Sequence, residues 1–228
     1  MFDFLLSEDA KRRKLLAISP EGPVKDFLSA PLIDRNQDVH AVSLLSLDFE
    51  TSGLDSAKDH IVSAGYVVIR RGEILLSTAM HELVRPDKLL TADSVVIHKI
   101  TDDDASDGKS LEEVVSRLLQ ALSGKVMLAH NANIELEFLK QACRKLYGIC
   151  PRFPAIDTMK IAKIWLERRN KEIEQGDLRL FNLRKRYGLP VYQAHNALTD
   201  AIATAELLQA QIAHMDSSKS LPLKQFIK

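Results

Sequence analysis

The sequence predicts a mixed α/β fold, in which one sheet carries helices on its faces and a short helical appendage precedes the domain. Three observations support this prediction. Three strand-like segments follow one another, short turn signals separate them, and the second half of the chain is mostly helical with one more short strand. A succession of this kind is typical of a mixed sheet covered by helices.

The three strands open the domain. The first covers residues 43–50, the second begins at His60 and is rich in β-branched side chains, and the third is EILLSTAMHELV, from Glu73. Arg71 and Gly72 lie between the second and third runs and predict a hairpin turn. We therefore expect these strands to form an antiparallel meander.

Helix boundary signals organise the rest of the domain. Ser110 and Glu113 form a capping box at the start of one helix, and Gly124 ends it. The helix NIELEFLKQACRKLY, from Asn133, ends in the same way at Gly148. The remaining predicted elements are a short strand over 125–129 and helices that start at Asp157, cover 178–188 and span about 196–213.

The two ends of the chain lie outside this domain. We place an N-terminal appendage at residues 1–40, the domain at 41–215 and a flexible, loosely held tail at 216–228. The appendage contains an amphipathic helix candidate whose basic residues run from Lys11 to Lys14. Such residues either contact phosphates or form an ordinary solvated helix face.

Composition limits the classes of function. The 228 residues contain 31 Lys and Arg and 31 Asp and Glu, so no overall positive field attracts nucleic acid and any such contact must be local. Cys143 and Cys150 lack metal-ligand spacing and are expected to be reduced. Because neither a secretory signal nor a long apolar run is found, we expect a cytoplasmic protein without a membrane span.

Two carboxylates lie side by side in the first predicted strand. Asp48 and Glu50 are two residues apart and share one face of that strand, while Leu47 and Phe49 point to the other face. Neighbouring acids repel each other if they are buried, so a bound hard cation is the simplest partner for them. Two solvated acids at an exposed strand end are the alternative explanation.

Two later helices each turn one carboxylate inward. At about 100° per residue, Glu135 falls in the middle of an apolar stripe that includes Phe138 and Leu139, where a buried ion pair or a metal would explain it. Asp200 lies on the alanine-rich inner face of the last helix, five residues after His195. If the three segments converge, they form an acid-lined pocket for two divalent ions, the arrangement that stabilises in-line displacement at phosphorus. A nearby His is suited to accept a proton from water near neutral pH.

Three stretches of the sequence resemble the motifs of a known family. LDFETSGLD, LAHNANIELEFL and HNALTDAIATAEL are similar to the three exonuclease motifs of the DEDDh branch of 3′–5′ exonucleases, a branch that includes the proofreading epsilon subunit of bacterial DNA polymerase III. The similarity covers about residues 43–213 in the family's order. It implies a ribonuclease H-like fold with a mixed five-stranded sheet.

The resemblance also implies roles for the inward residues. Asp48, Glu50 and Asp200 resemble the family's metal ligands, with two Mg²⁺ or Mn²⁺ ions as cofactors, and His195 resembles its general base. Glu135 stands where the family has Asp, which keeps the charge but adds a methylene, and we expect it to bind metal directly or through water. The residues expected to hold the terminal nucleotide are Phe49, Thr51, Leu54, His98 and Asn131.

The activity implied by the resemblance is hydrolysis of single-stranded DNA from its 3′ end, with release of nucleoside 5′-monophosphates. The implied partners are a nucleic-acid 3′ end and a DNA polymerase or repair assembly. Two alternatives stay open: an RNA-trimming exoribonuclease or oligoribonuclease of the same branch, and a catalytically weakened nucleic-acid interaction module, which Glu135 alone favours. Outside the motifs, Asp157 is interpreted as a structural helix cap. The basic residues Arg179, Arg184, Lys185 and Arg186 are interpreted either as contacts to the nucleic-acid backbone or as a solvated helix face.

Overall fold

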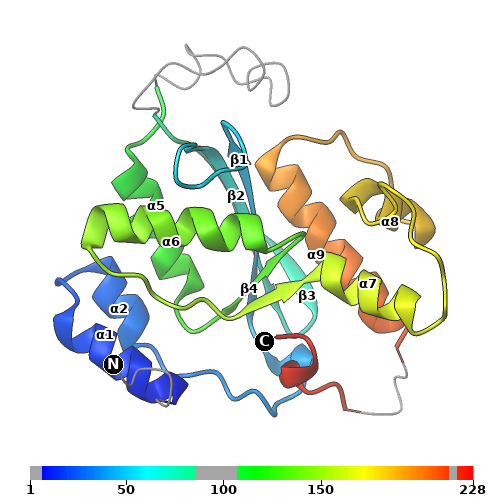
Figure 1. Ribbon diagram of the computed structural model, residues 1–228, viewed down its shortest axis with the longest axis horizontal. Coiled ribbons are helices and arrows are strands. Elements are labelled where there is room, and N and C mark those ends of the chain that lie inside the picture. Colours follow the sequence, from blue (N-terminus) through cyan, green and yellow to red (C-terminus); the bar gives the residue numbers. More distant parts are fainter. Residues whose placement is uncertain (1–6, 86–106, 216–219, 228) are drawn as a thin grey trace.

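A five-stranded mixed sheet forms the centre of the molecule (Figure 1). The computed structural model describes residues 7–85, 107–215 and 220–227. The strand order is β3-β2-β1-β4-β5, which places β1 in the middle. The strands are β1 (Leu44–Thr51), β2 (Ile61–Arg70), β3 (Glu73–Leu83), β4 (Val126–Ala129) and β5 (Ala155–Asp157).

The pairing confirms the expected meander and the mixed sheet. β1 and β2 are antiparallel, as are β2 and β3, whereas β4 pairs with β1 and with β5 in parallel. Arg71 and Gly72 both have positive φ, as the tight hairpin between β2 and β3 requires. The last strand, β5, has only three residues, too few to show a periodicity, so the residue pattern alone did not reveal it.

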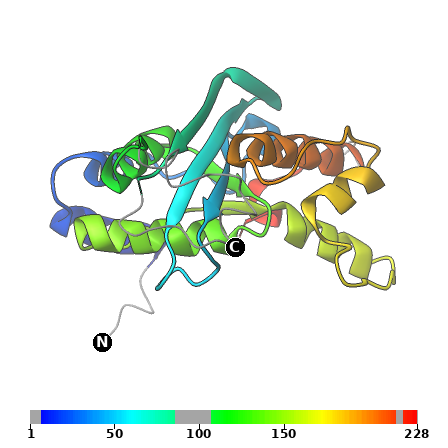
Figure 2. The same cartoon turned by 90° about the horizontal axis from the view of Figure 1, so that it is seen from above.

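Helices cover both faces of this sheet (Figure 2). On one face, α5 (Leu111–Leu122) and α6 (Asn133–Tyr147) pack against Leu45, Leu47 and Phe49 of β1. On the other face lies α9 (Ala197–Ala213), followed outward by α7 (Thr158–Glu167) and α8 (Leu180–Arg186). Among the helices that the structure describes, none combines the length and the apolar character needed to cross a bilayer.

The predicted helix ends are confirmed where capping chemistry decided them. The Ser110 hydroxyl accepts a hydrogen bond from the Glu113 backbone N–H while the Glu113 carboxylate accepts one from the Ser110 N–H, which is the expected capping box. Gly148 ends α6 with φ 70°, a left-handed conformation that glycine adopts without a steric penalty. The Asp157 side chain caps α7, as expected.

Described residues near both termini pack onto the domain. The N-terminal segment contains α1 (Glu8–Ile18), α2 (Pro23–Ser29) and the 3₁₀ turn η2 (Val39–Ala41), and Val24 and Leu28 of α2 join the main hydrophobic core beside α5. The C-terminal residues 220–227 include the 3₁₀ turn η3 (Leu223–Gln225). The Leu221 N–H donates to Asp38 Oδ2 at 2.8 Å and Leu223 is fully buried, so this part of the predicted tail is not loosely held. The division into 1–40, 41–215 and 216–228 stays a prediction.

Candidate active site

Three carboxylates converge beside the middle of the sheet. Asp48, Glu50 and Asp200 each place one carboxylate oxygen within 4.8 Å of the others. Two of these residues come from β1 and the third from the first turn of α9, more than a hundred residues later. The predicted convergence of β1 and the last helix is therefore observed.

Strand alternation fixes the direction of the two β1 acids. Leu47 and Phe49 face α5 and α6, so Asp48 and Glu50 face the opposite side, where α9 lies. Ser46, two residues before Asp48 on the same face of β1, donates a hydrogen bond from its hydroxyl to the Ala201 carbonyl at 2.6 Å, inside the protein. This buried hydrogen bond ties β1 to α9 next to the acid cluster.

Helix capping and backbone contacts position Asp200. Asn196 caps α9 by accepting a hydrogen bond from the Thr199 N–H at 3.0 Å. Asp200 Oδ2 accepts a hydrogen bond from the His195 backbone N–H at 3.2 Å. Its second oxygen, Oδ1, is buried and has no hydrogen-bond partner within the described part of the chain.

Gly65 allows α9 to approach the sheet at this point. It lies on β2 directly opposite Asp48 in the strand register. A Cβ atom at Gly65 would lie 2.1 Å from the backbone C of Ala197 and from the backbone N of Leu198. No side chain fits there, so a glycine is needed to bring Asp200 close to β1. Sequence reasoning missed this residue, although a glycine inside a β-branched strand is a known signal of close backbone approach.

Glu135 reaches the neighbourhood of the cluster without being part of it. It lies in the first turn of α6 and is only 3% exposed, as the apolar stripe predicted. Its Oε2 has no hydrogen-bond partner among the residues described. Burial, followed by the charges of Asp157 and Glu50, raises the Glu135 pKa to about 8, and the Phe49 backbone N–H opposes this. Direct metal ligation by Glu135 thus stays a prediction.

Two of the three cluster acids, Asp200 and Asp48, also have raised pKa values. Burial is the main cause that raises the Asp200 pKa to about 7, and the charge of Glu50 contributes in the same direction. The Asp48 pKa is raised well above its usual range by burial and by the charges of Glu135, Asp200 and Glu50. Several carboxylates that cannot all ionise comfortably together indicate a place for positive charge.

The residues present fit hard divalent cations. All three cluster members supply carboxylate oxygens, the ligands that Mg²⁺ and Mn²⁺ prefer. The unsatisfied buried oxygens of Asp200 and Glu135 are further sites where an ion or a metal-held water would be stabilised. Asp48, Glu50 and Asp200 are the residues that would hold such ions.

His195 adjoins the cluster from the solvent side. Its side chain is exposed, and its backbone has φ 68°, an uncommon conformation for a residue other than glycine. The hydrogen bond from its backbone N–H to Asp200 explains how this conformation is held. Its role as a general base stays a prediction.

The loop after β4 carries the residues that precede Glu135. His130 is held on both sides: its Nδ1 lies 2.8 Å from the Thr158 hydroxyl and its Nε2 lies 2.9 Å from the Leu178 carbonyl. Asn131 has φ 64° and donates its backbone N–H to Asp157 Oδ1 at 3.1 Å. Because Asp157 also caps α7, one carboxylate fixes both the loop and the helix beside Glu135, which goes beyond its predicted capping role.

The five residues predicted to bind the nucleotide lie in different surroundings. The Phe49 side chain is only 6% exposed and belongs to the hydrophobic core, and the expected contact of Phe49 with a nucleotide stays a prediction. Thr51 donates its hydroxyl to the Gly53 carbonyl at 2.7 Å, and Leu54 is 81% exposed on the following loop. Asn131 lies in the loop beside Glu135, and His98 lies outside the described residues.

Arg184 differs from both interpretations of the basic run. It is 1% exposed and donates to the Ala203 carbonyl at 2.7 Å and to the Pro190 carbonyl at 2.9 Å. It pairs with Glu206 at 2.7 Å, and its guanidinium carbon lies 4.5 Å from the ring centroid of Tyr192. Arg184 therefore connects α8, the segment leading to His195, and α9, and is neither solvated nor available to phosphates.

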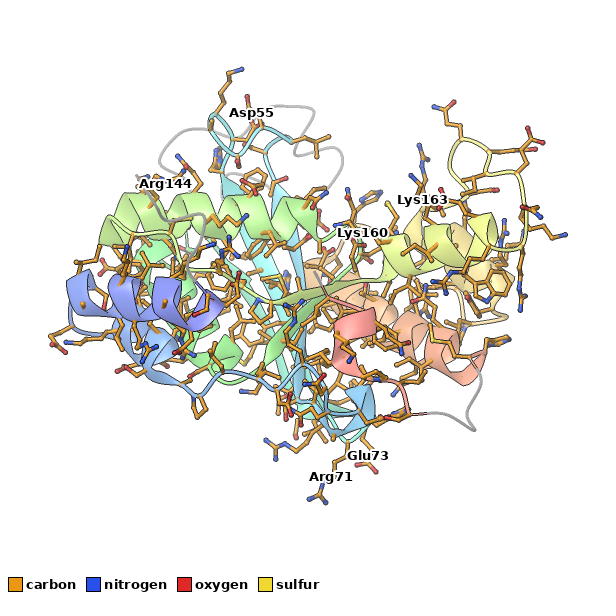
Figure 3. All side chains as sticks on the ribbon, turned by 60° about the horizontal axis from the view of Figure 1, so that its bottom comes forward. Asp55, Arg71, Glu73, Arg144, Lys160 and Lys163 are labelled. Atoms are coloured by element: carbon orange, nitrogen blue, oxygen red, sulfur yellow. The ribbon has the colours of Figure 1, made fainter. Side chains whose placement is uncertain are left out.

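Lys160 is a basic residue near the site that sequence reasoning did not single out. Figure 3 shows it at the start of α7, beside the beginning of α6. Its Nζ lies 3.4 Å from Asn133 Oδ1 and 3.5 Å from Asp157 Oδ2. A lone lysine on a polar helix face carries no sequence signal, so only the packing of α7 against the site reveals it.

The mixed five-stranded sheet and the carboxylate cluster beside its central strand are the arrangement expected of a ribonuclease H-like exonuclease. The chain belongs to the Exonuclease family, whose sequence pattern it matches over residues 45–208. Both the predicted fold and the predicted family are thereby confirmed.

Several sequence relatives are named as DNA polymerase III proteins. The chain is 34% identical over 161 residues to the DNA polymerase III PolC-type of Thermotoga petrophila, a match that covers 71% of this chain and 11% of that protein. It is 32% identical over 177 residues to the DNA polymerase III subunit epsilon of Treponema pallidum, a match that covers 76% of this chain and 78% of that subunit. The chain thus spans about a tenth of the PolC-type relatives and most of the epsilon relative.

Solved structures share the fold. Cell-death related nuclease 4 superposes with a TM-score of 0.65 at 20% identity, covering 78% of this chain and 64% of that one. E. coli Exonuclease I in complex with a dA16 oligonucleotide has a TM-score of 0.65 at 18% identity, covering 76% of this chain and 41% of that one.

Proposed function

We propose that this protein is a metal-dependent 3′–5′ exonuclease that acts on single-stranded DNA and releases nucleoside 5′-monophosphates. The observation that carries the proposal is the convergence of Asp48, Glu50 and Asp200 in a member of the Exonuclease family. Relatives named as a polymerase epsilon subunit and as PolC-type polymerases support DNA as the substrate and a polymerase or repair assembly as the partner. The presence of an oligonucleotide in the E. coli Exonuclease I structure supports a single strand as the bound form.

In this proposal, each part of the reaction has a residue assigned to it. Two Mg²⁺ or Mn²⁺ ions, when bound by Asp48, Glu50 and Asp200, would stabilise the charge that develops at the scissile phosphate. His195 accepts a proton from the attacking water, whose oxygen bonds to phosphorus while the bond to the 3′ oxygen of the preceding nucleotide breaks. Lys160, at the rim, is suited to contact a phosphate of the strand. The products are a 5′-monophosphate and a strand with a new 3′ hydroxyl.

The test is a gel assay on single-stranded DNA labelled at its 5′ end, with Mn²⁺ or with EDTA. The proposal expects a ladder that shortens by one nucleotide at a time and disappears both in EDTA and in the Asp48→Asn variant. Asp26→Asn is the matched control, because Asp26 is exposed on α2 outside the site. An endonuclease pattern, or full activity of Asp48→Asn, would contradict the proposal.

RNA trimming is the second candidate, because a carboxylate cluster in a member of the Exonuclease family fits phosphodiester hydrolysis in RNA as well as in DNA. Matched DNA and RNA oligomers of one sequence, assayed with the same enzyme and ion, separate the two substrates. Faster turnover of RNA would replace DNA in the proposal while leaving the reaction unchanged. A chain that binds the strands but cleaves neither would instead be an interaction module.

A further inference from the structure

A groove of about 930 Å³ lies away from the acid cluster, between the N-terminal helices and α6. Its walls are α1, residues 30–35, one side of α6 and residues 150–154, with Ile227 closing one edge. Figure 1 shows α1 and α2 lying below α6, with α1 running alongside it. Except for α6, residues 124–125 and residues 150–154, the lining residues fall outside the stretch 45–208 that matches the Exonuclease family. The groove is therefore mainly a product of what this chain adds to the family domain.

The groove lies on a different side of α6 from the catalytic residues. Leu136, Lys140 and Arg144 line it, and at 100° per residue they lie roughly 100–180° around the helix from Glu135. Figure 3 shows Arg144 near the far end of α6 from Lys160, which stands beside the acid site. A ligand in this groove would thus leave the acid cluster accessible.

Positive charge is concentrated in this groove although the whole chain is neutral. Among the described residues that line it, eight are basic and two are acidic, an excess of six positive charges. Both acids already face a base, because Glu8 pairs with Arg152 and Glu137 pairs with Lys140 at 2.8 Å. The eight basic residues are Lys11, Arg12, Lys14, Arg35, Lys125, Lys140, Arg144 and Arg152.

Two of these cations are held against apolar surface. Burial lowers the pKa of Arg12, and burial together with the charge of Arg70 lowers the pKa of Lys125. Partial burial thus disfavours the charged form of both side chains, although the charge of Asp9 opposes this at Arg12. An anionic partner would relieve this.

The interior of the groove is aliphatic, and two of its large side chains are exposed. Ile18 is 70% exposed and Leu32 is 52% exposed, although both line the groove. The two aromatic residues do not offer free faces for bases, because Phe27 and Phe153 pack on each other with ring centroids 5.1 Å apart. Single-stranded nucleic acid usually stacks its bases on exposed aromatic rings. A protein segment fits this lining better.

We propose that the groove between α1 and α6 binds an acidic amphipathic segment of a partner protein. Apolar side chains of that segment, at helical spacing, cover the aliphatic floor around Leu32, and its carboxylates face the basic rim. A groove of this size corresponds to a small interface, so we expect weak, transient binding. This proposal does not depend on the nuclease reaction.

The test measures fluorescence anisotropy of a labelled peptide with the full chain. The probe is a designed peptide of roughly 16 residues with Leu on one helical face and Glu on the other. The proposal expects micromolar binding that weakens about tenfold or more for a scrambled peptide of equal composition, and with rising salt. A peptide with Lys in place of Glu should not bind.

Paired variants locate the binding site. Lys11→Glu/Lys14→Glu should weaken binding about tenfold or more, whereas Lys171→Glu/Lys185→Glu, with the same change of charge at exposed positions outside the groove, should not. Leu32→Ser should weaken it while Leu76→Ser, at a similarly exposed leucine of β3, should not. Circular dichroism confirms that each variant is folded.

Four results would overturn the proposal. The first is no binding of the acidic peptide, and the second is equal binding by the Lys11→Glu/Lys14→Glu and Lys171→Glu/Lys185→Glu variants. The third is tight binding of a dT16 oligonucleotide that Lys11→Glu/Lys14→Glu abolishes. The fourth is peptide binding that appears only after residues 1–6 are deleted. The last result would make the chain's own N-terminal segment the occupant.

Discussion

Replacing Gly65 with Ala is expected to separate the two halves of the acid cluster. The new Cβ would lie 2.1 Å from backbone atoms of Ala197 and Leu198, and backbone atoms cannot move aside by changing a rotamer. Real Cβ contacts essentially never fall below 3.0 Å, so the first turn of α9 must retreat by about 1 Å. Asp200 lies in that turn, whereas Asp48 lies on β1 directly opposite Gly65.

The size of the effect follows from this displacement. Overpacking of this kind costs about 1–3 kcal/mol of stability. A misplacement of about 1 Å in a catalytic group can lower turnover about 100-fold. The two effects are separable, because the clash acts at one turn of α9 and not on the whole core. We therefore expect a folded variant with weak Mn²⁺ binding and little nuclease activity.

Three measurements on Gly65→Ala check this reasoning: urea unfolding, Mn²⁺ titration by calorimetry, and turnover of a single-stranded oligonucleotide. Gly148→Ala is the control, since Gly148 has φ 70° and an open surrounding, so its substitution strains the end of α6 without touching the cluster. It should lose stability but keep Mn²⁺ affinity and activity. Wild-type Mn²⁺ affinity and turnover in Gly65→Ala would refute the idea that close approach of α9 builds the site.

Three further predictions concern charge. The raised pKa values of the buried acids stabilise the folded state below the unfolded values near pH 4, and this stabilisation is lost as pH rises through the folded values of about 8 for Glu135 and about 7 for Asp200. In EDTA the melting temperature should therefore fall between pH 5 and 8.5, and Mn²⁺ should raise it more at pH 8.5 than at pH 5. A melting temperature in EDTA that does not change with pH would contradict the role assigned to these two acids. Glu135→Gln should raise the melting temperature in EDTA at pH 8 and weaken Mn²⁺ binding about tenfold. The control Glu137→Gln, at an exposed position of α6, should change neither quantity. Unchanged Mn²⁺ affinity in Glu135→Gln would exclude Glu135 from ion binding. Arg184→Met should lower the free energy of unfolding in urea by about 3–5 kcal/mol, because it removes the arginine that pairs with the Glu206 carboxylate and donates to two backbone carbonyls. Arg184→Lys should recover part of this loss. A loss below about 1 kcal/mol would show that the residues around Arg184 rearrange to satisfy these groups.

Local sequence chemistry determined a large part of this protein. Alternation in β1 gave the common direction of Asp48 and Glu50, the capping residues gave the start of α5 and the end of α6, and the apolar stripe gave the burial of Glu135. These features were predictable because each depends on neighbours within one or two turns or on a two-residue repeat. The three motifs together also gave the family, and with it the five-stranded sheet.

Tertiary packing alone decided the distances between these elements. It brought Asp200 into the cluster through the contact at Gly65 and left Glu135 at its edge. It also buried the side chain of Phe49, which the resemblance placed at the nucleotide, and that of Arg184, which the sequence left open between a backbone contact and a solvated helix face. Residues that are adjacent beside the acid cluster can be 155 positions apart in the chain, as in the Ser46–Ala201 hydrogen bond. Periodicity tells which face of an element a side chain occupies, but the partner of that face depends on how all the elements fill the core together. For that reason the sequence supplied the groups and their directions, and the folded core set their separations.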